Sequence, residues 1–140
     1  MNQGYYSRLD VLWTVFSRVP NATAYVRGSK KYPDIRGVVQ FYEYQNNVLA
    51  VAEMMGLPTS KEICRKGIYA FHIHEGDLPP LFENEGYALS VFLTNRFKIE
   101  DILGKTVIVH SDTDDFHTQP SGNAGEKIAC GEIIPIKMMI

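Results

Sequence analysis

The sequence lacks any apolar run close to the roughly 20 residues that a membrane-spanning helix needs. Its most apolar N-terminal stretch, residues 9–19, is interrupted by Asp10 and Arg18. That stretch also has no small-residue cleavage pattern of the kind that ends a signal peptide. We therefore expect a cytoplasmic protein that does not act at a membrane.

Basic clusters and cysteines are also scarce. The net charge is −2, and no basic cluster is larger than the pair Lys30-Lys31. A nucleic-acid-binding surface is therefore not expected. Cys64 and Cys130 are the only two cysteines, and two cysteines neither prove nor exclude a disulfide.

No internal repeat and no linker rich in glycine, proline or serine divides the 140 residues. The hydrophobic content of 45% and the charged content of 21% are ordinary for a globular protein with one buried core. We expect an N-terminal helical extension over residues 1–20, followed by a single domain over residues 21–140.

The N-terminal extension has an amphipathic pattern. Leu9, Leu12, Trp13 and Phe16 stand at helical spacing, and Pro20 ends the pattern. A helix that packs on the domain through these four side chains is the prediction, and a helix that binds a partner is the alternative.

From residue 22 onward the apolar period changes to two, which is typical of strands with one buried face. Residues 76–86, which contain Pro79-Pro80, are expected to form a loop. Residues 98–103 fit either a helical turn or an irregular link. Strands without interleaved helices predict an all-β fold, an antiparallel Greek-key sandwich or barrel with a short N-terminal helix. The expected strands cover residues 24–27, 37–44, 48–54, 67–75, 87–94, 106–110 and 127–134.

Three of the four histidines, His72, His74 and His110, lie in or at the end of an expected strand. Alternate residues of a strand point to the same face, so His72 and His74 can both reach one metal ion. Copper suits imidazole, and no paired cysteines near these histidines offer a thiolate site. The pattern predicts a mononuclear copper site. Two polar residues on the exposed face of a strand are the simpler alternative.

Three blocks of the sequence resemble, in family order, the signatures of the copper/zinc superoxide dismutases. They are residues 70–75 (AFHIHE), residues 102–110 with Asp114-Asp115 after them, and residues 122–133 (GNAGEKIACGEI). With the β-pattern before them, they cover residues 22–134. The resemblance implies a superoxide dismutase-like β-sandwich or barrel, superoxide as the substrate and copper as the cofactor.

The resemblance also implies roles for single residues. His72, His74 and His110 match three copper ligands, and Asp114 matches the aspartate that orients metal-bound imidazoles. Lys127 stands where most members have the arginine that draws superoxide to copper. A lysine keeps the positive charge and loses the planar fork, so Lys127 is the expected catalytic residue.

The main departure from the family is a long loop that is nearly missing after the His-x-His strand. That loop normally supplies the bridging histidine, further zinc ligands and the disulfide partner of Cys130. Asp77 could match the zinc aspartate, but no histidine lies between His74 and His110, so zinc is not expected. His117 is either an exposed loop residue or a substitute ligand.

Two functions remain open on this reading. The retained histidines and Lys127 favour an enzyme, a copper-dependent dismutase that converts superoxide to dioxygen and hydrogen peroxide at a reduced rate. The missing loop favours a non-catalytic copper-binding or structural β-sandwich module. Cys64 can pair with Cys130 only if the chain before the His-x-His strand folds back, and both thiols are otherwise reduced. A homodimer is possible on either reading.

Overall fold

Eight strands and two helices make up the part of the chain that the computed structural model describes, residues 8–59, 67–74, 76–111 and 125–137. Neither helix in these ranges is long and apolar enough to cross a membrane. The helices are α1 (Arg8–Ser17) and α2 (Ile99–Ile102), and the strands are β1 (Ala22–Gly28), β2 (Arg36–Tyr44), β3 (Asn47–Met55), β4 (Ile68–Ile73), β5 (Gly76–Phe82), β6 (Ala88–Thr94), β7 (Thr106–His110) and β8 (Lys127–Pro135).

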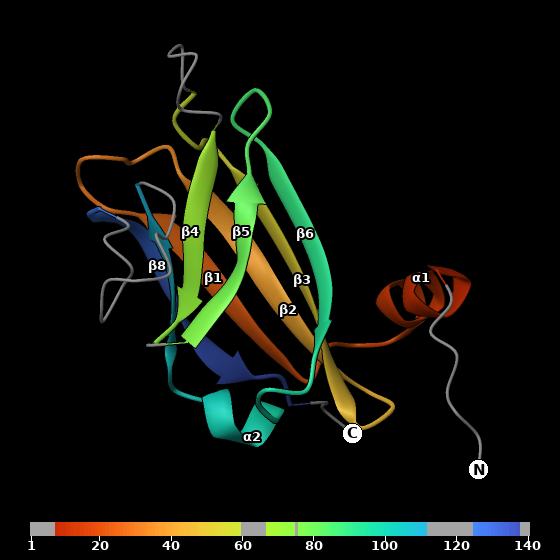
Figure 1. Cartoon of the computed structure of the whole chain (residues 1–140). Coiled ribbons are helices and arrows are strands. Elements are labelled where there is room, and N and C mark those ends of the chain that lie inside the picture. Colours follow the sequence, from red (N-terminus) through yellow and green to blue (C-terminus); the bar gives the residue numbers. More distant parts are fainter. Residues whose placement is uncertain (1–7, 60–66, 75, 112–124, 138–140) are drawn as a thin grey trace.

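All strand pairs are antiparallel, in the order β5-β4-β7-β8-β1-β2-β3-β6. The first and last strands of this order, β5 and β6, lie side by side, so the sheet curls into a nearly closed barrel (Figure 1). Apolar side chains from the inner face of every strand fill the barrel. The predicted all-β antiparallel fold with a short N-terminal helix is confirmed.

The β2–β3 hairpin shows how local sequence sets the register. Tyr44 pairs with Asn47, which leaves Gln45 and Asn46 as a two-residue turn. Both turn residues have positive φ, 45° and 66°. A tight turn of this kind matches the twist of the two strands, and asparagine tolerates the left-handed conformation well. This turn, between the strands expected over residues 37–44 and 48–54, therefore fixes which side chains of β2 and β3 face the core.

The loop predicted over residues 76–86 is wrong in its first half, where β5 forms and pairs with β4. The register changes between Tyr69, opposite Leu81, and Phe71, opposite Leu78. Pro79 and Pro80 therefore occupy a β-bulge at the start of the sheet order. Proline lacks the N–H that a ladder needs, but an edge strand or a bulge tolerates it.

The segment over residues 98–103, left open between two structures, forms the short helix α2. The backbone N–H of Lys98 donates to the Asp101 carboxylate over 3.0 Å. Ile99 and Ile102 are buried in the core cluster, so α2 closes one end of the barrel (Figure 1).

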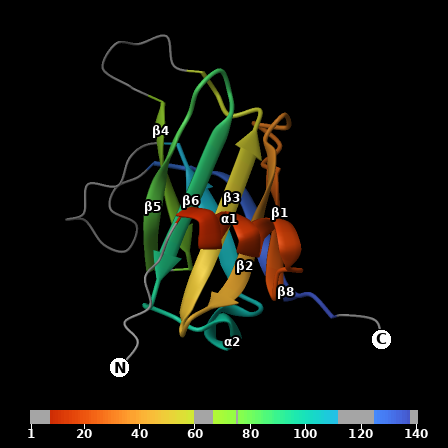
Figure 2. The same cartoon turned by 90° about the vertical axis from the view of Figure 1, so that its right-hand side faces the viewer.

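The predicted N-terminal helix is confirmed as α1, but its predicted contact face is wrong. Val11 and Val15 pack on Tyr42 and Leu49, on the outer face of the sheet. Figure 2 shows α1 lying across β6, β3 and β2. The shorter, β-branched valines let the helix approach two bulky side chains of the sheet closely. The larger apolar residues point away from the sheet, and they are Leu9, Leu12, Trp13 and Phe16, exposed by 75%, 51%, 72% and 83%.

Candidate metal centre

Two of the three predicted copper ligands lie next to each other. His72 is on β4 and His110 ends β7, and these strands are hydrogen-bonded neighbours. The flanking residues Phe71 and Val109 face the core, so the two histidines face the outside of the barrel. The imidazole centroids are 4.8 Å apart in an edge-to-face arrangement. Both histidines are nevertheless buried, at 4% and 3% exposure.

Each of these imidazoles has a hydrogen-bond partner. His72 Nε2 lies 2.9 Å from Asp77 Oδ1, and Asp77 stands directly opposite His72 in the β4–β5 ladder. His110 Nδ1 lies 3.3 Å from the carbonyl oxygen of Gly125. A buried ring with such a partner is held in one orientation, which is how outer partners position metal-ligating histidines.

His74 is not where the alternation of a strand would put it. The strand ends at Ile73, and His74 has φ of 54° and is exposed. Ile73 pairs with Gly76, so His74 begins the two-residue link of a tight hairpin, where positive φ is needed. The prediction that His72 and His74 share one strand face is therefore wrong. No group of three possible metal ligands occurs within the described ranges.

His74 instead lines a surface pocket of about 280 Å³. Asp77, Arg96 and Lys105 line the same pocket. A guanidinium nitrogen of Arg96 donates to the backbone carbonyl of Asp77 over 3.4 Å. Arg96 and Lys105 give this end of the site positively charged lining residues. The sequence did not indicate this grouping, because residues 74, 96 and 105 are far apart along the chain.

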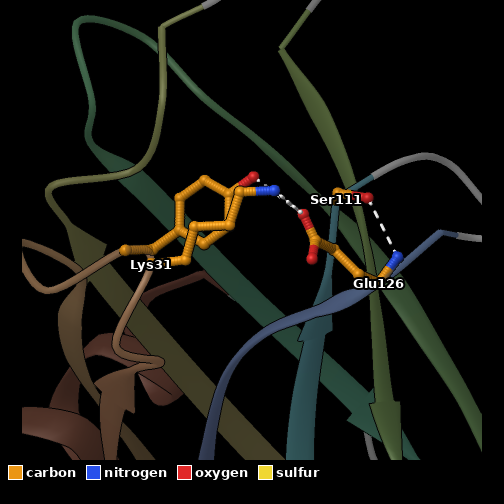
Figure 3. A network of polar contacts seen from close by, with 4 residues as sticks. Lys31, Ser111 and Glu126 are labelled. Carbon is orange, nitrogen blue, oxygen red and sulfur yellow. Dashed lines mark hydrogen bonds and ion pairs between the residues drawn. The ribbon is translucent and has the colours of Figure 1, made fainter.

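Lys127, the predicted catalytic cation, is exposed and opens β8 opposite His110. Its neighbour Glu126 is part of a polar network (Figure 3). The Glu126 carboxylate lies 3.1 Å from Lys31 Nζ and accepts a hydrogen bond from Tyr32 Oη over 2.9 Å. The Glu126 N–H donates to Ser111 Oγ over 3.2 Å.

This network joins the loop after β1 to the segment before β8. The hydrogen bond from Lys31 is the largest cause that holds the pKa of Glu126 below its usual value, and the Tyr32 hydrogen bond adds to it. The same carboxylate raises the pKa of Lys31. The network therefore favours the charged forms of both groups, and it connects the residue before Lys127 to the loop after β1.

The other predicted site residues cannot be placed. Asp114, His117 and Cys64 lie outside the described residues. Cys130 is a free, exposed cysteine on β8. The roles predicted for Asp114 and His117 stay predictions.

Comparison with known proteins finds one family that matches part of the chain. Residues 69–133 match the family profile described as copper/zinc superoxide dismutase (SODC). This part of the chain is similar to the copper/zinc superoxide dismutase family. It contains His72, Asp77 and His110, most of β4, the strands β5 to β7 and most of β8. The resemblance recognised in the sequence is thereby confirmed.

Curated relatives in this superoxide dismutase family come from several bacteria. A protein named superoxide dismutase [Cu-Zn] from Deinococcus radiodurans is 40% identical over 62 residues, 41% of this chain and 34% of the relative. Superoxide dismutase [Cu-Zn] 2 of Aquifex aeolicus is 33% identical over 69 residues, 43% of this chain and 40% of the relative. The superoxide dismutase-like protein YojM of Bacillus subtilis is 33% identical over 70 residues, 44% and 36% of the two chains. The chain thus spans little more than a third of these relatives' lengths.

Sequence reasoning missed the contact between Asp77 and His72. It assigned Asp77 only a doubtful place in a zinc site. The contact follows from the β4–β5 ladder, in which Ile73 pairs with Gly76 and His72 with Asp77. The assumption that Pro79-Pro80 excluded a strand concealed it.

Proposed function

We propose that this superoxide dismutase-like protein binds copper through His72 and His110. The observation that carries the proposal is the pair of buried imidazoles on neighbouring strands, 4.8 Å apart. Imidazole is a ligand type that suits copper, and each ring has one nitrogen held by a protein group, as is usual for metal-ligating histidines. The donor set therefore fits copper as far as these two ligands go.

His74 is the third ligand on this proposal. It sits one residue beyond the end of β4, at the start of a tight link. Rotation of that link would be needed to bring its ring to the outer face that carries His72 and His110. Asp77 would hold His72 in place through the hydrogen bond to Nε2.

Copper, when bound, supplies one-electron oxidation and reduction. The relatives' names point to superoxide as the substrate. The chain's own contribution is to attract the anion. Lys127 stands beside His110, and Arg96 and Lys105 line the pocket beside His74. Positive charge around a site raises the local concentration of an anionic substrate. Zinc has no place in this proposal, because Asp77 is engaged with His72.

The exposed position of His74 favours a second candidate, a non-catalytic copper-binding module. Two imidazoles bind copper less tightly than three, and a site without its third ligand is poorly fixed in geometry. The two candidates share His72 and His110, and they differ in whether His74 takes part and in whether the bound metal turns over.

Copper titration of the purified protein tests the shared part. His72→Ala and His110→Ala should each weaken Cu(II) binding by at least tenfold, whereas His117→Ala, the matched histidine control, should change it less than twofold. If His117→Ala is as damaging as His72→Ala, the assignment of the ligands is wrong. Electron paramagnetic resonance then counts the nitrogen ligands, and loss of one nitrogen in His74→Ala places His74 on the metal.

A superoxide-consumption assay separates the two candidates. The copper-loaded protein should be faster than its His72→Ala variant and faster than free copper at the same concentration. Equal rates for all three would reject the enzyme and leave the binding module. Failure of the wild-type protein to bind copper at all would reject both.

A further inference from the structure

The outer face of α1, made of Leu9, Leu12, Trp13 and Phe16, is a large apolar surface that the sheet does not cover. More than half of each side chain is exposed. The opposite side of the helix is apolar as well, because Val11 and Val15 pack on the sheet. A helix that is apolar on both sides is typical of one that is covered on both sides.

We propose that this face binds a second copy of the chain, as an antiparallel pair of α1 helices related by a two-fold axis. The proposal is independent of the copper site. It rests on the spacing of the four residues, on the area that they expose and on the charges around them.

The spacing of the outer face reads the same in both directions. The gaps from Leu9 to Leu12, Trp13 and Phe16 are three, one and three residues. A two-fold axis between Leu12 and Trp13 therefore sets Leu9 against the partner's Phe16 and Leu12 against the partner's Trp13. Each contact then joins an aromatic residue to a leucine, and each occurs twice, as an isologous interface requires.

The exposed area is in the range that such a pair needs. A buried aromatic side chain covers about 200 Å² and a leucine about 100 Å², so the outer face exposes on the order of 450 Å² per chain. Burying it on two copies removes roughly 900 Å², which lies at the low end of interface sizes, where weak and transient contacts are found. Leu89 and Val91 on β6, a strand that α1 crosses, are further exposed apolar residues, at 56% and 48% exposure.

The charges favour a protein partner over a lipid surface. An interfacial helix carries a polar face rich in lysine and arginine. The described part of α1 has Arg8 as its one basic residue, and Arg18, just beyond it, donates to the Glu43 carbonyl over 2.7 Å. The side of α1 opposite its outer face lies on the sheet, where no lipid headgroup could reach it (Figure 2).

The test uses Trp13, the single tryptophan of the chain, as its reporter. Sedimentation should show a monomer–dimer equilibrium between about 1 and 200 μM protein, the concentration range of weak self-association. Tryptophan emission should shift to the blue over the same range, because Trp13 leaves water. A monomer at every concentration, or an unchanged emission maximum, overturns the proposal.

Charged variants test the arrangement of the two helices. Phe16→Glu and Leu9→Lys should each weaken self-association by about thirtyfold or more, the usual threshold of a hot-spot residue. Phe82→Glu, a matched control at an exposed phenylalanine on β5, should leave it unchanged. Circular dichroism establishes that each variant is folded. Equal effects of Phe16→Glu and Phe82→Glu would reject the surface.

Mixing the Leu9→Lys and Phe16→Glu variants is the decisive test of the arrangement. In an antiparallel pair, Lys at position 9 of one chain meets Glu at position 16 of the other, while the second contact stays apolar. An equimolar mixture should therefore recover association that neither variant shows alone, and failure to recover it rejects the two-fold arrangement. A blue shift caused by vesicles of phosphatidylcholine and phosphatidylglycerol, without any self-association, would identify a lipid surface as the occupant and overturn the proposal.

Discussion

Removing the carboxylate of Asp77 should destabilise the metal-free protein through its effect on His72. His72 is buried, whereas the Asp77 side chain is 43% exposed. The pair is therefore intermediate between exposed pairs, worth about 0.2–1 kcal/mol, and buried pairs, whose rupture costs about 3–5 kcal/mol. We expect Asp77→Ala to lower the free energy of unfolding by about 1.5 kcal/mol, because a buried imidazole loses a partner 2.9 Å away.

A double-mutant cycle isolates this contact. Asp77→Ala, His72→Ala and the double variant are unfolded in urea with a chelator present, so that no metal contributes. The coupling energy should be about 1 kcal/mol or more, since residues in direct contact are not additive. By thermal unfolding, Asp77→Ala should lower the Tm by about 3–6 °C. If the two single effects add to within about 0.3 kcal/mol, the hydrogen bond does not hold His72 and the reasoning fails.

Three further predictions concern the edges of the site. Glu126→Gln should destabilise the protein near neutral pH and have no effect in acid. Lys31 lowers the pKa of Glu126 in the folded protein. The stabilisation that the Glu126 carboxylate gives is therefore present above its unfolded-state pKa and is lost as pH falls through its folded-state pKa. Urea unfolding at several pH values measures this, and a pH-independent effect would contradict it. Gly131→Ala should lower the free energy of unfolding by about 2 kcal/mol or more, because an added Cβ would overlap the backbone carbonyl of Tyr25. Urea unfolding measures this, and an unchanged free energy would show that the strands can shift. Lys127→Glu should slow superoxide consumption by the copper-loaded protein, and the difference from wild type should shrink as salt screens exposed charges over about 8–10 Å; a salt-independent difference would exclude steering.

Much of the fold was predictable because the signals that set it are local. The β2–β3 hairpin follows from Gln45 and Asn46, and the alternation of β2 and β3 needs no information from elsewhere in the chain. The strand β5 was missed because Pro79-Pro80 was taken to exclude a strand. Proline excludes a strand only where both of its edges must form backbone hydrogen bonds. An edge position and a bulge remove that requirement, and neither can be seen from the residues alone.

The candidate site, too, could be predicted from the sequence only in part. His72 and His110 could be predicted as neighbours only from the family blocks, because their contact depends on the pairing of β4 with β7. His74 was misplaced because alternation was extended one residue beyond the strand. The contact face of α1 was wrong for another reason. Helical spacing shows which residues share a face, and it cannot say which of two apolar faces meets the sheet.

The bulge at Pro79-Pro80 also bears on how the protein avoids aggregation. The ladder order begins at β5 and ends at β6, so the barrel has a seam there that backbone hydrogen bonds do not close among the described residues. An unpaired strand edge is a template to which another chain can add its own strand. Two adjacent prolines remove two N–H donors from β5 and bend it, which makes that edge a poor template. The residues that were expected to form a loop therefore make the β5 edge of this seam poorly suited to pairing with a strand of another chain.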